Sequence, residues 1–310
     1  PGQLVPLTLG HGTHTAGLIV ANGSSGQGVQ GTCKHCGLAE WKISYAQCFL
    51  HQVNLFWNSL AQPRALTSAV DTGAQVVSMS FGGAAPADYC YAQLNPPILN
   101  PDPLCIAMQY ATNRATAMVA SSGNDRTDLN FPASEPNVIS AGGFQESLAL
   151  WDESPGSTTN CPLLPGFPPG TECGSDFTST RPDGRQESMA SANAVLSTTY
   201  PQFNYVDYAH CGDGYPGPGW GNGVGLCTGT SMSAPQIAGV VGILRSINPL
   251  LRVGLPTDPE SAPSVRGRLA STTVQAQVGQ SWNTTFGYGR PDAATAARKM
   301  LGGPVGRVIA

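Results

Sequence analysis

The sequence predicts an α/β fold in which a mostly parallel central sheet carries helices on both faces. Segments of helical character alternate along the chain with short apolar strands, which is the pattern of a parallel sheet covered on both sides. Residues 231–247 are apolar nearly all round, as in a helix buried inside a domain. Hydrophobic residues make up 41% of the 310 residues, which permits a substantial core.

The first part of the chain supplies two helices and two strands. A run of small and apolar residues at 12–21 predicts a compact helix, and residues 38–44 alternate well enough to predict a strand. Residues 64–72 predict a second helix that ends at Gly73, before a buried strand at 75–80.

The same order of helix and strand then repeats. Residues 104–115 predict a helix, residues 117–120 an apolar strand, and residues 137–141 the next strand. Sheets of this kind bind ligands in the loops that follow the carboxyl ends of their strands. The loop at 121–124 is therefore a candidate site loop.

Three stretches rich in Gly, Pro, Ser and Cys interrupt this pattern, and we interpret them as surface insertions. They lie near residues 84–106, 152–188 and 200–227. No internal repeat and no linker marks a second domain, so we expect a single domain over residues 1–310.

Composition argues against nucleic-acid and membrane partners. The formal net charge is −4, and no basic run of the kind that binds phosphate backbones occurs. No apolar run reaches the length needed to span a bilayer. We expect a monomer with neither nucleic acid nor a membrane as partner.

Nine cysteines indicate an oxidising compartment, so we expect a secreted or extracellular protein, with the periplasm as an alternative. Spacing does not determine connectivity, but three local pairs are reasonable: Cys90 with Cys105, Cys161 with Cys173, and Cys211 with Cys227. For Cys33 and Cys36, a local disulfide competes with the pairing of one of them with Cys48. The odd count leaves at least one thiol unpaired within the chain.

Three stretches carry candidate catalytic groups. His11 begins a predicted helix, where it could act as a general base if a carboxylate held its other ring nitrogen. Ser231 opens the buried helix, where unpaired N–H groups suit it to stabilising an oxyanion. Asn124 follows the strand at 117–120 and presents an amide.

Each stretch alone has an ordinary structural explanation. His11 and His14 fit half a metal site or two core residues. Ser231 fits a helix N-cap, and Asn124 fits a turn. Their joint occurrence, in the order His, Asn, Ser and each at the edge of an apolar element, favours one catalytic site.

Several stretches together resemble the subtilisin-like serine protease family, the subtilases. They are HGTHTAG at 11–17, VVSMSFGG at 76–83, ASSGN at 120–124 followed by FPA, GTSMSAP at 229–235, and FGYGRPDAATAA at 286–297. The resemblance covers nearly the whole chain apart from the insertions. It implies the three-layer fold of that family and a serine endopeptidase that acts on peptides or proteins.

The resemblance implies a role for each candidate. His11 matches the general base, and Ser231 matches the nucleophile that attacks a peptide carbonyl. The Asn124 side chain and the Ser231 backbone N–H match the oxyanion hole. His14 matches a structural position on the same helix.

Two groups of substrate-binding residues are implied as well. The segment that pairs with an extended substrate backbone is matched by Ser80, Phe81, Gly82 and Gly83. One wall of the pocket for the residue before the scissile bond is matched by Ser121, Ser122 and Gly123.

The triad Asp of the family is not found. It should lie upstream of His11 on the first strand, and none of the ten residues before His11 is acidic. Asp71-Thr72-Gly73 has the right letters but ends a predicted helix, so we interpret Asp71 as a surface residue. We expect an N-terminally incomplete domain that lacks this strand; the alternative is a pseudoprotease that binds peptides.

Further alternatives concern chemistry and ions. A peptide acyl-transferase would use the same site, whereas GTSMS is not the G-x-S-x-G elbow of an α/β-hydrolase esterase. We expect no required cofactor and no catalytic metal. The oxygen-rich turn at 22–28 occupies the place where some subtilases bind calcium, but it has no carboxylate, so a structural calcium ion there is only a candidate.

Overall fold

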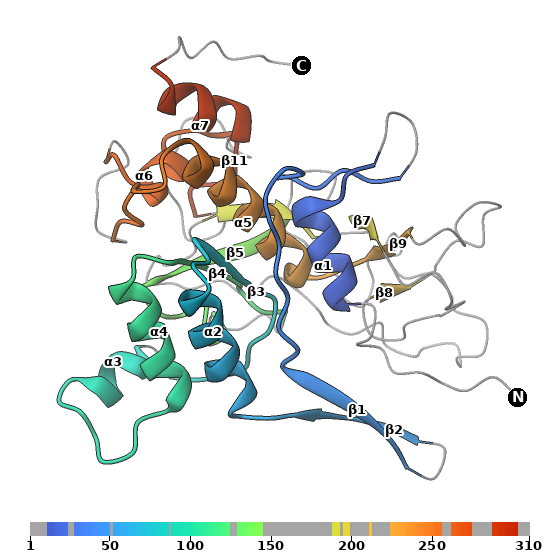
Figure 1. The fold of residues 1–310 in the computed structure, drawn as a ribbon, viewed down its shortest axis with the longest axis vertical. Coiled ribbons are helices and arrows are strands. Elements are labelled where there is room, and N and C mark those ends of the chain that lie inside the picture. The colour runs from blue at the N-terminus through green and yellow to red at the C-terminus, as the bar shows by residue number, and fades with distance from the viewer. Residues whose placement is uncertain are drawn as a thin grey trace, which may run out of the picture.

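A central sheet flanked by helices dominates the computed structural model of this chain (Figure 1). The structure describes residues 11–23, 28–49, 52–86, 88–124, 129–144, 188–192, 195–198, 211–212, 224–255, 262–274 and 287–302. None of the helices in these ranges combines the length and the apolar character needed to cross a membrane. Most of the predicted insertions at 152–188 and 200–227 lies outside the described residues.

The central sheet has four parallel strands in the order β3, β4, β5, β6. Their bounds are Val76–Met79, Ala117–Ser121, Val138–Phe144 and Ser188–Ser191. All five residues of β4 are buried, as expected of a strand covered on both faces. Among the described strands, β3 pairs on one side only, and three of its four residues are just partly buried.

Alternate residues of the strands pack against different helices. Ala117 and Val119 of β4 belong to one apolar core, and Met118 and Ala120 belong to another. This alternation follows from the two-residue period of a strand, which sends successive side chains to opposite faces. The chain therefore has three layers.

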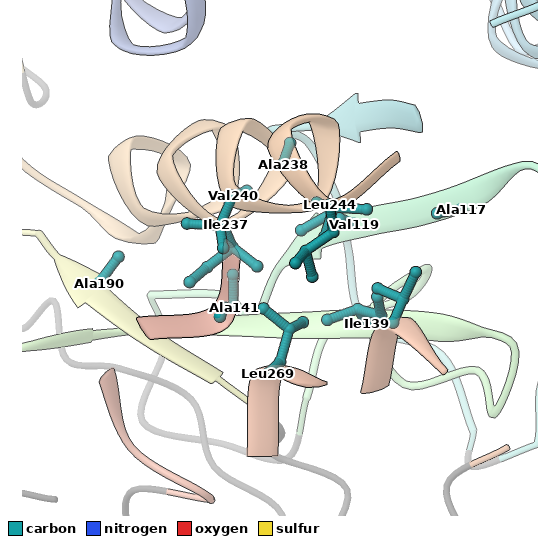
Figure 2. Close-up of a cluster of buried hydrophobic side chains, with 14 of the residues drawn as sticks. Ala117, Val119, Ile139, Ala141, Ala190, Ile237, Ala238, Val240, Leu244 and Leu269 are labelled. Atoms are coloured by element: carbon teal, nitrogen blue, oxygen red, sulfur yellow. The ribbon is translucent and has the colours of Figure 1, made fainter. Parts of the chain in front are cut away.

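Helix α5 (Thr230–Ile247) covers the first face of the sheet. Its side chains Ile237 and Leu244 lie over Val119 and Ile139 of the strands, as Figure 2 shows. Twelve of its residues are buried, which explains why its sequence is apolar on nearly every side. Helices α6 (Val265–Ala270) and α7 (Ala293–Met300) extend the same core.

Helices α2 (Ala61–Asp71) and α4 (Pro103–Asn113) cover the second face. The Asp102 carboxylate caps α4 by accepting a hydrogen bond from the Leu104 N–H at 2.8 Å, with Pro103 in the first turn. Both helices agree with the sequence prediction within three residues at each end.

Helix α1 (His11–Val20) lies beside α5 and against a second, antiparallel sheet (Figure 1). That sheet has the order β7 (Val195–Thr198), β9 (Val224–Cys227), β8 (Cys211–Gly212). A Cβ atom at Gly17 would collide with the Thr198 hydroxyl, so glycine permits the close approach of α1 and β7.

The predicted strand at 38–44 is wrong except for its last residue. Strand β1 (Ser44–Phe49) instead forms an antiparallel hairpin with β2 (Gln52–Trp57), which projects away from the central sheet in Figure 1. Residues 38–43 pair with no strand in the described part of the chain. Alternation in sequence predicts a strand only if a neighbour is present to complete the ladder.

The remaining short elements complete the chain. They are α3 (Tyr89–Leu94), β10 (Thr273–Val274) and β11 (Arg290–Pro291). Strands β10 and β11 pair with each other, and α3 sits in the predicted insertion near 84–106.

Two disulfides are described, Cys33–Cys36 and Cys90–Cys105. The predicted pair Cys90–Cys105 is thus confirmed, and Cys33 forms the local bond rather than one to Cys48. Cys227 is also disulfide-bonded, and the register of β8 and β9 sets Cys211 opposite it. Cys161 and Cys173 lie outside the described residues.

Candidate active site

Ser231 is the second residue of α5, in the turn where backbone N–H groups have no partner within the helix. Gly229 is the N-cap residue of this helix, and its φ of 129° is a conformation that side chains disfavour. A Cβ atom at Gly229 would lie 3.2 Å from the Asn124 amide nitrogen. The glycine therefore lets the Asn124 side chain approach the start of the helix.

Hydrogen bonds to its side-chain oxygen hold Asn124 in place. Its Oδ1 accepts hydrogen bonds from the Thr230 N–H at 3.1 Å and from the Thr230 hydroxyl at 2.8 Å. The hydroxyl of Thr230 in turn accepts a hydrogen bond from the Gly123 N–H at 3.2 Å. With the oxygen occupied in this way, the NH₂ group of Asn124 remains as the donor beside the first turn of α5.

Thr230 is a residue whose role the sequence prediction missed. It is 1% exposed, and its single hydroxyl links the end of β4 to the start of α5. Its position directly before Ser231 was the available signal, but only the folded chain brings Gly123 and Asn124 to it.

Ser80 connects the end of β3 to the same turn. Its hydroxyl donates a hydrogen bond to the Ser231 carbonyl oxygen at 2.8 Å. The loops after β3 and β4 thus meet the amino end of α5 at one edge of the sheet, where parallel sheets carry their sites.

His11 is the first residue of α1 and is partly buried. Two hydroxyls of β7 hold the first turn of this helix: Thr198 donates to the Thr13 carbonyl and Ser197 to the His14 carbonyl, each at 2.8 Å. Because α1 also packs against α5, the helices that begin with His11 and with Thr230-Ser231 are direct neighbours.

His14 is fully buried, and its Nε2–H donates to the Val195 carbonyl at 2.9 Å and to the Gly225 carbonyl at 3.3 Å. Its Nδ1 has no hydrogen-bond partner among the described residues. Burial lowers the pKa of His14 to about 4, so the ring is neutral at pH 7. These contacts fit the structural role expected for it. Across the described ranges, no group of three His, Cys, Asp or Glu side chains could hold a metal ion.

The predicted substrate-binding residues lie in the same loops. Ser121, Ser122 and Gly123 are buried at the end of β4, and the Ser122 carbonyl accepts a hydrogen bond from the Asn130 N–H at 2.8 Å. Gly83 forms a two-way backbone bridge with Phe131, at 2.8 and 3.0 Å. The backbone N–H and carbonyl of Gly83 are therefore both engaged with Phe131.

Asp71 is exposed at the end of α2 and accepts a hydrogen bond from the Tyr110 hydroxyl at 2.7 Å. This contact also raises the pKa of Tyr110. The interpretation of Asp71 as a surface residue is confirmed, because its side chain is exposed and bonds to Tyr110 of α4. The turn at 22–28 is described only in part, since residues 24–27 lie outside the described ranges.

Comparison with known proteins adds independent findings. The subtilase family model matches residues 1–289. Thermitase from Thermoactinomyces vulgaris is 25% identical over 238 residues, which are 76% of this chain and 61% of thermitase. Fervidolysin from Fervidobacterium pennivorans is 26% identical over 281 residues, which cover 90% of this chain and 33% of fervidolysin. The chain thus spans less than two thirds of either relative.

A solved structure of a lanthipeptide protease has the same fold. Its TM-score is 0.60, with 18% identity, over 94% of this chain and 75% of that chain. At this identity the likeness concerns the fold alone. It confirms the predicted α/β architecture with a parallel sheet between helices.

Proposed function

The chain belongs to the subtilase family, and on that premise we propose that it is a serine endopeptidase that cleaves peptide bonds through an acyl-enzyme. The observation that carries the proposal is the coupling of Asn124 to the start of α5. Thr230 holds the amide oxygen, so the amide NH₂ and the Ser231 N–H form a pair of donors beside the nucleophile.

The proposed reaction has two halves. His11 takes the proton of the Ser231 hydroxyl while the oxygen attacks the peptide carbonyl, and the two donors stabilise the oxyanion. His11 then gives the proton to the leaving amine, which departs with the carboxyl-terminal part of the substrate. In the second half, His11 takes a proton from water while the water oxygen attacks the acyl group. His11 then returns the proton to the Ser231 oxygen as the new carboxyl end of the substrate leaves.

A triad needs a carboxylate to orient His11, and Asp71 is engaged elsewhere. In subtilisin, loss of the triad Asp alone lowers turnover by about 3 × 10⁴. The location of Asp71 is the observation that favours the second candidate, a pseudoprotease that retains the groove and binds peptides without cleaving them.

The test is reaction of the 310-residue chain with a fluorophosphonate, followed by peptide mass spectrometry of the adduct. We expect labelling at Ser231 that is abolished in Ser231→Ala and strongly slowed in His11→Ala. A labelling rate that rises with added formate in the parent chain, but not in His11→Ala, would identify the orienting carboxylate as the limiting group. A folded chain that stays unlabelled, with and without formate, contradicts the peptidase and leaves the peptide-binding candidate.

We also propose that the protein works in an oxidising compartment, as a secreted or extracellular protein. The Cys33–Cys36 and Cys90–Cys105 disulfides support this, because such bonds persist where thiols are not kept reduced. Mass spectrometry of the protein isolated from its native source under alkylating conditions tests it: both bonds should be intact.

A further inference from the structure

The loop that follows α1 packs directly on α5. Gly239 and Gly242 lie on one face of α5, because residues three apart on a helix are neighbours. A Cβ atom at Gly239 would lie 2.6 Å from the Thr32 Cβ atom, and one at Gly242 would lie 3.0 Å from the Cys36 Sγ atom. Residues 32–36 therefore rest on the backbone of α5, where a residue larger than glycine would push them away.

The same loop holds the carboxyl end of α1. The Thr32 N–H donates to the Leu18 carbonyl at 2.9 Å, and the Cys33 N–H donates to the Ile19 carbonyl at 2.7 Å. Carbonyls in the last turn of a helix have no partner within the helix, so these bonds satisfy them. The loop thus joins α1 to α5, and both of these helices begin in the candidate active site.

A disulfide closes this loop between Cys33 and Cys36, which are three residues apart. Cys33 is buried, whereas Cys36 is only partly buried, and Lys34 and His35 between them are exposed. Cys36 is therefore the cysteine that a thiol from solution reaches, with Cys33 as the leaving group. A cation beside a cysteine favours its thiolate, so Lys34, which is next to Cys33 in sequence, makes Cys33 a better leaving group.

The second described disulfide, Cys90–Cys105, differs in both accessibility and loop length. Both of its cysteines are buried, and they are 15 residues apart. A bond that closes a longer loop restricts the unfolded chain more and stabilises the fold more. We therefore expect Cys33–Cys36 to be the more easily reduced of these two bonds.

Reduction of Cys33–Cys36 would change the contact of the loop with α5. Without a bond between them, the two sulfur atoms must separate to van der Waals contact. Gly242 already lies close to the Cys36 sulfur, so α5 blocks movement in that direction, and the Cys33 N–H is tied to Ile19. Cys36 is left to move towards solvent, which loosens the connection between α1 and α5.

We propose that Cys33–Cys36 is a thiol–disulfide exchange site, attacked at Cys36 by dithiols, and that its reduction slows the reaction of Ser231. A thiolate of the dithiol attacks the Cys36 sulfur, forms a mixed disulfide and releases the Cys33 thiolate, which takes up a proton. The second thiolate of the dithiol then attacks the reagent's sulfur in the mixed disulfide, closes the reagent's disulfide and releases Cys36 as a thiolate, which is also protonated. Two electrons pass from the dithiol to the protein in this reaction.

The exchange would relate the reactivity of Ser231 to the surroundings of the chain. In an oxidising compartment the bond is closed and the connection between α1 and α5 is complete. A chain with both thiols reduced would react more slowly. The effect on Ser231 rests on the proposed function, whereas the exchange at Cys33–Cys36 does not.

The first measurement compares the two bonds in the folded 310-residue chain. Dithiothreitol is added without denaturant, free thiols are alkylated at intervals with iodoacetamide, and the cysteine peptides are quantified by mass spectrometry. We expect Cys33–Cys36 to be reduced about tenfold faster than Cys90–Cys105, because Cys36 is the more accessible target. Equal rates, or faster reduction of Cys90–Cys105, would overturn the exchange site.

The second measurement follows Ser231 after the dithiothreitol has been removed. Fluorophosphonate labelling should slow about fivefold in protein whose Cys33–Cys36 bond is reduced and whose Cys90–Cys105 bond is intact, and oxidised glutathione should restore the rate. Cys33→Ser/Cys36→Ser should label at the slow rate and should not respond to dithiothreitol. The matched control, Cys90→Ser/Cys105→Ser, should keep the full response.

The outcomes separate this inference from the proposed function. A labelling rate that does not change when Cys33–Cys36 is reduced overturns the effect on Ser231. A chain that is never labelled, but in which Cys33–Cys36 is reduced first, contradicts the proposed function and supports the exchange site. If Cys33→Ser/Cys36→Ser does not fold, restoration of the rate by oxidised glutathione in the parent chain makes the same comparison.

Discussion

Helices α5 and α1 both begin in the candidate active site, but they are held there in different ways. Side-chain hydrogen bonds from the ends of two strands hold the start of α5, through Ser80 and Asn124. Helix α1 is held by hydrogen bonds from the Ser197 and Thr198 hydroxyls to its first turn and, in addition, by close packing against β7 at Gly17. The amino end of α5 is thus fixed by hydrogen bonds, whereas the position of α1 depends on hydrogen bonds and on a close packing contact.

This difference predicts which changes affect the reaction rate of Ser231 and which affect the free energy of unfolding. Changes at the start of α5 should alter the reaction of Ser231 more than the free energy of unfolding, because the hydrogen bonds there orient the groups of the candidate site. Changes inside the contact of α1 with β7 should lower the stability of the fold first. Each prediction below tests one side of this contrast.

Removal of the proposed oxyanion donor should have the largest effect. Asn124→Ala deletes the amide, so the rate of fluorophosphonate labelling at Ser231 should fall about 10²–10³-fold. Asn137→Ala, at a partly buried asparagine that bonds to Thr112 on α4, is the control and should label at the parent rate. An unchanged rate in Asn124→Ala would remove Asn124 from the site.

Acid should weaken the fold through His14. The pKa of this ring is about 4 in the folded chain and about 6.5 when unfolded. Between these values the unfolded state binds the extra proton, so stability is lost as the pH falls from 6.5 towards 4. The loss should be about 3 kcal/mol, measured by urea unfolding over this range.

A variant that cannot take up a proton tests whether His14 causes this pH dependence. His14→Gln retains a donor for the Val195 carbonyl but cannot take up a proton, so its free energy of unfolding should depend less on pH. Equal slopes in the two proteins would mean that other groups cause the acid sensitivity.

Two glycines of α1 provide a matched pair. Gly17→Ala forces a Cβ atom onto Ser197 and Thr198, so it should destabilise the fold by about 1–3 kcal/mol. At Gly12 a Cβ atom meets nothing within 4 Å, so Gly12→Ala should stabilise the helix by about 0.5–1 kcal/mol. Thermal unfolding measures both, and effects of the same sign would contradict the packing explanation.

A change at Thr230 should lower the labelling rate less than a change at Asn124. Thr230→Val removes the hydroxyl that bonds to Asn124 and accepts from Gly123, and the labelling rate should fall about tenfold, equivalent to about 1.4 kcal/mol. Thr230→Ser keeps the hydroxyl and should retain most of the rate. A parent-like rate in Thr230→Val would show that the Thr230 N–H suffices to hold the amide.

Much of the fold could be predicted because its elements carry local signals. The apolar strand at 117–120 and the helix at 231–247 were placed within a residue at most of their ends, since burial on all sides leaves few polar positions. Residues 38–44 were mispredicted because their alternation does not reveal whether a neighbouring strand exists. Strand pairing depends on distant parts of the chain, and a single sequence does not contain it explicitly.

The residues of the candidate site come from the sequence motifs, but the contacts between them could not be predicted. The motifs point to His11, Asn124 and Ser231 only through their joint occurrence. The bond from Ser80 to the Ser231 carbonyl joins residues 151 positions apart, and the bridge from Gly83 to Phe131 occupies groups assigned to the substrate. Such contacts follow from the meeting of several loops, which no local pattern encodes.

The outer edge of strand β3 bears on how concentrated samples of this protein behave. Its outer edge is unpaired among the described strands, and Val76 and Val77 there are only partly buried. Backbone groups on an open apolar edge are a template for a strand from another molecule. We expect concentrated samples to aggregate by growth from this edge. Because the side chains of Val76 and Val77 pack against the two apolar cores, a charged residue at either position would lower the stability of the fold.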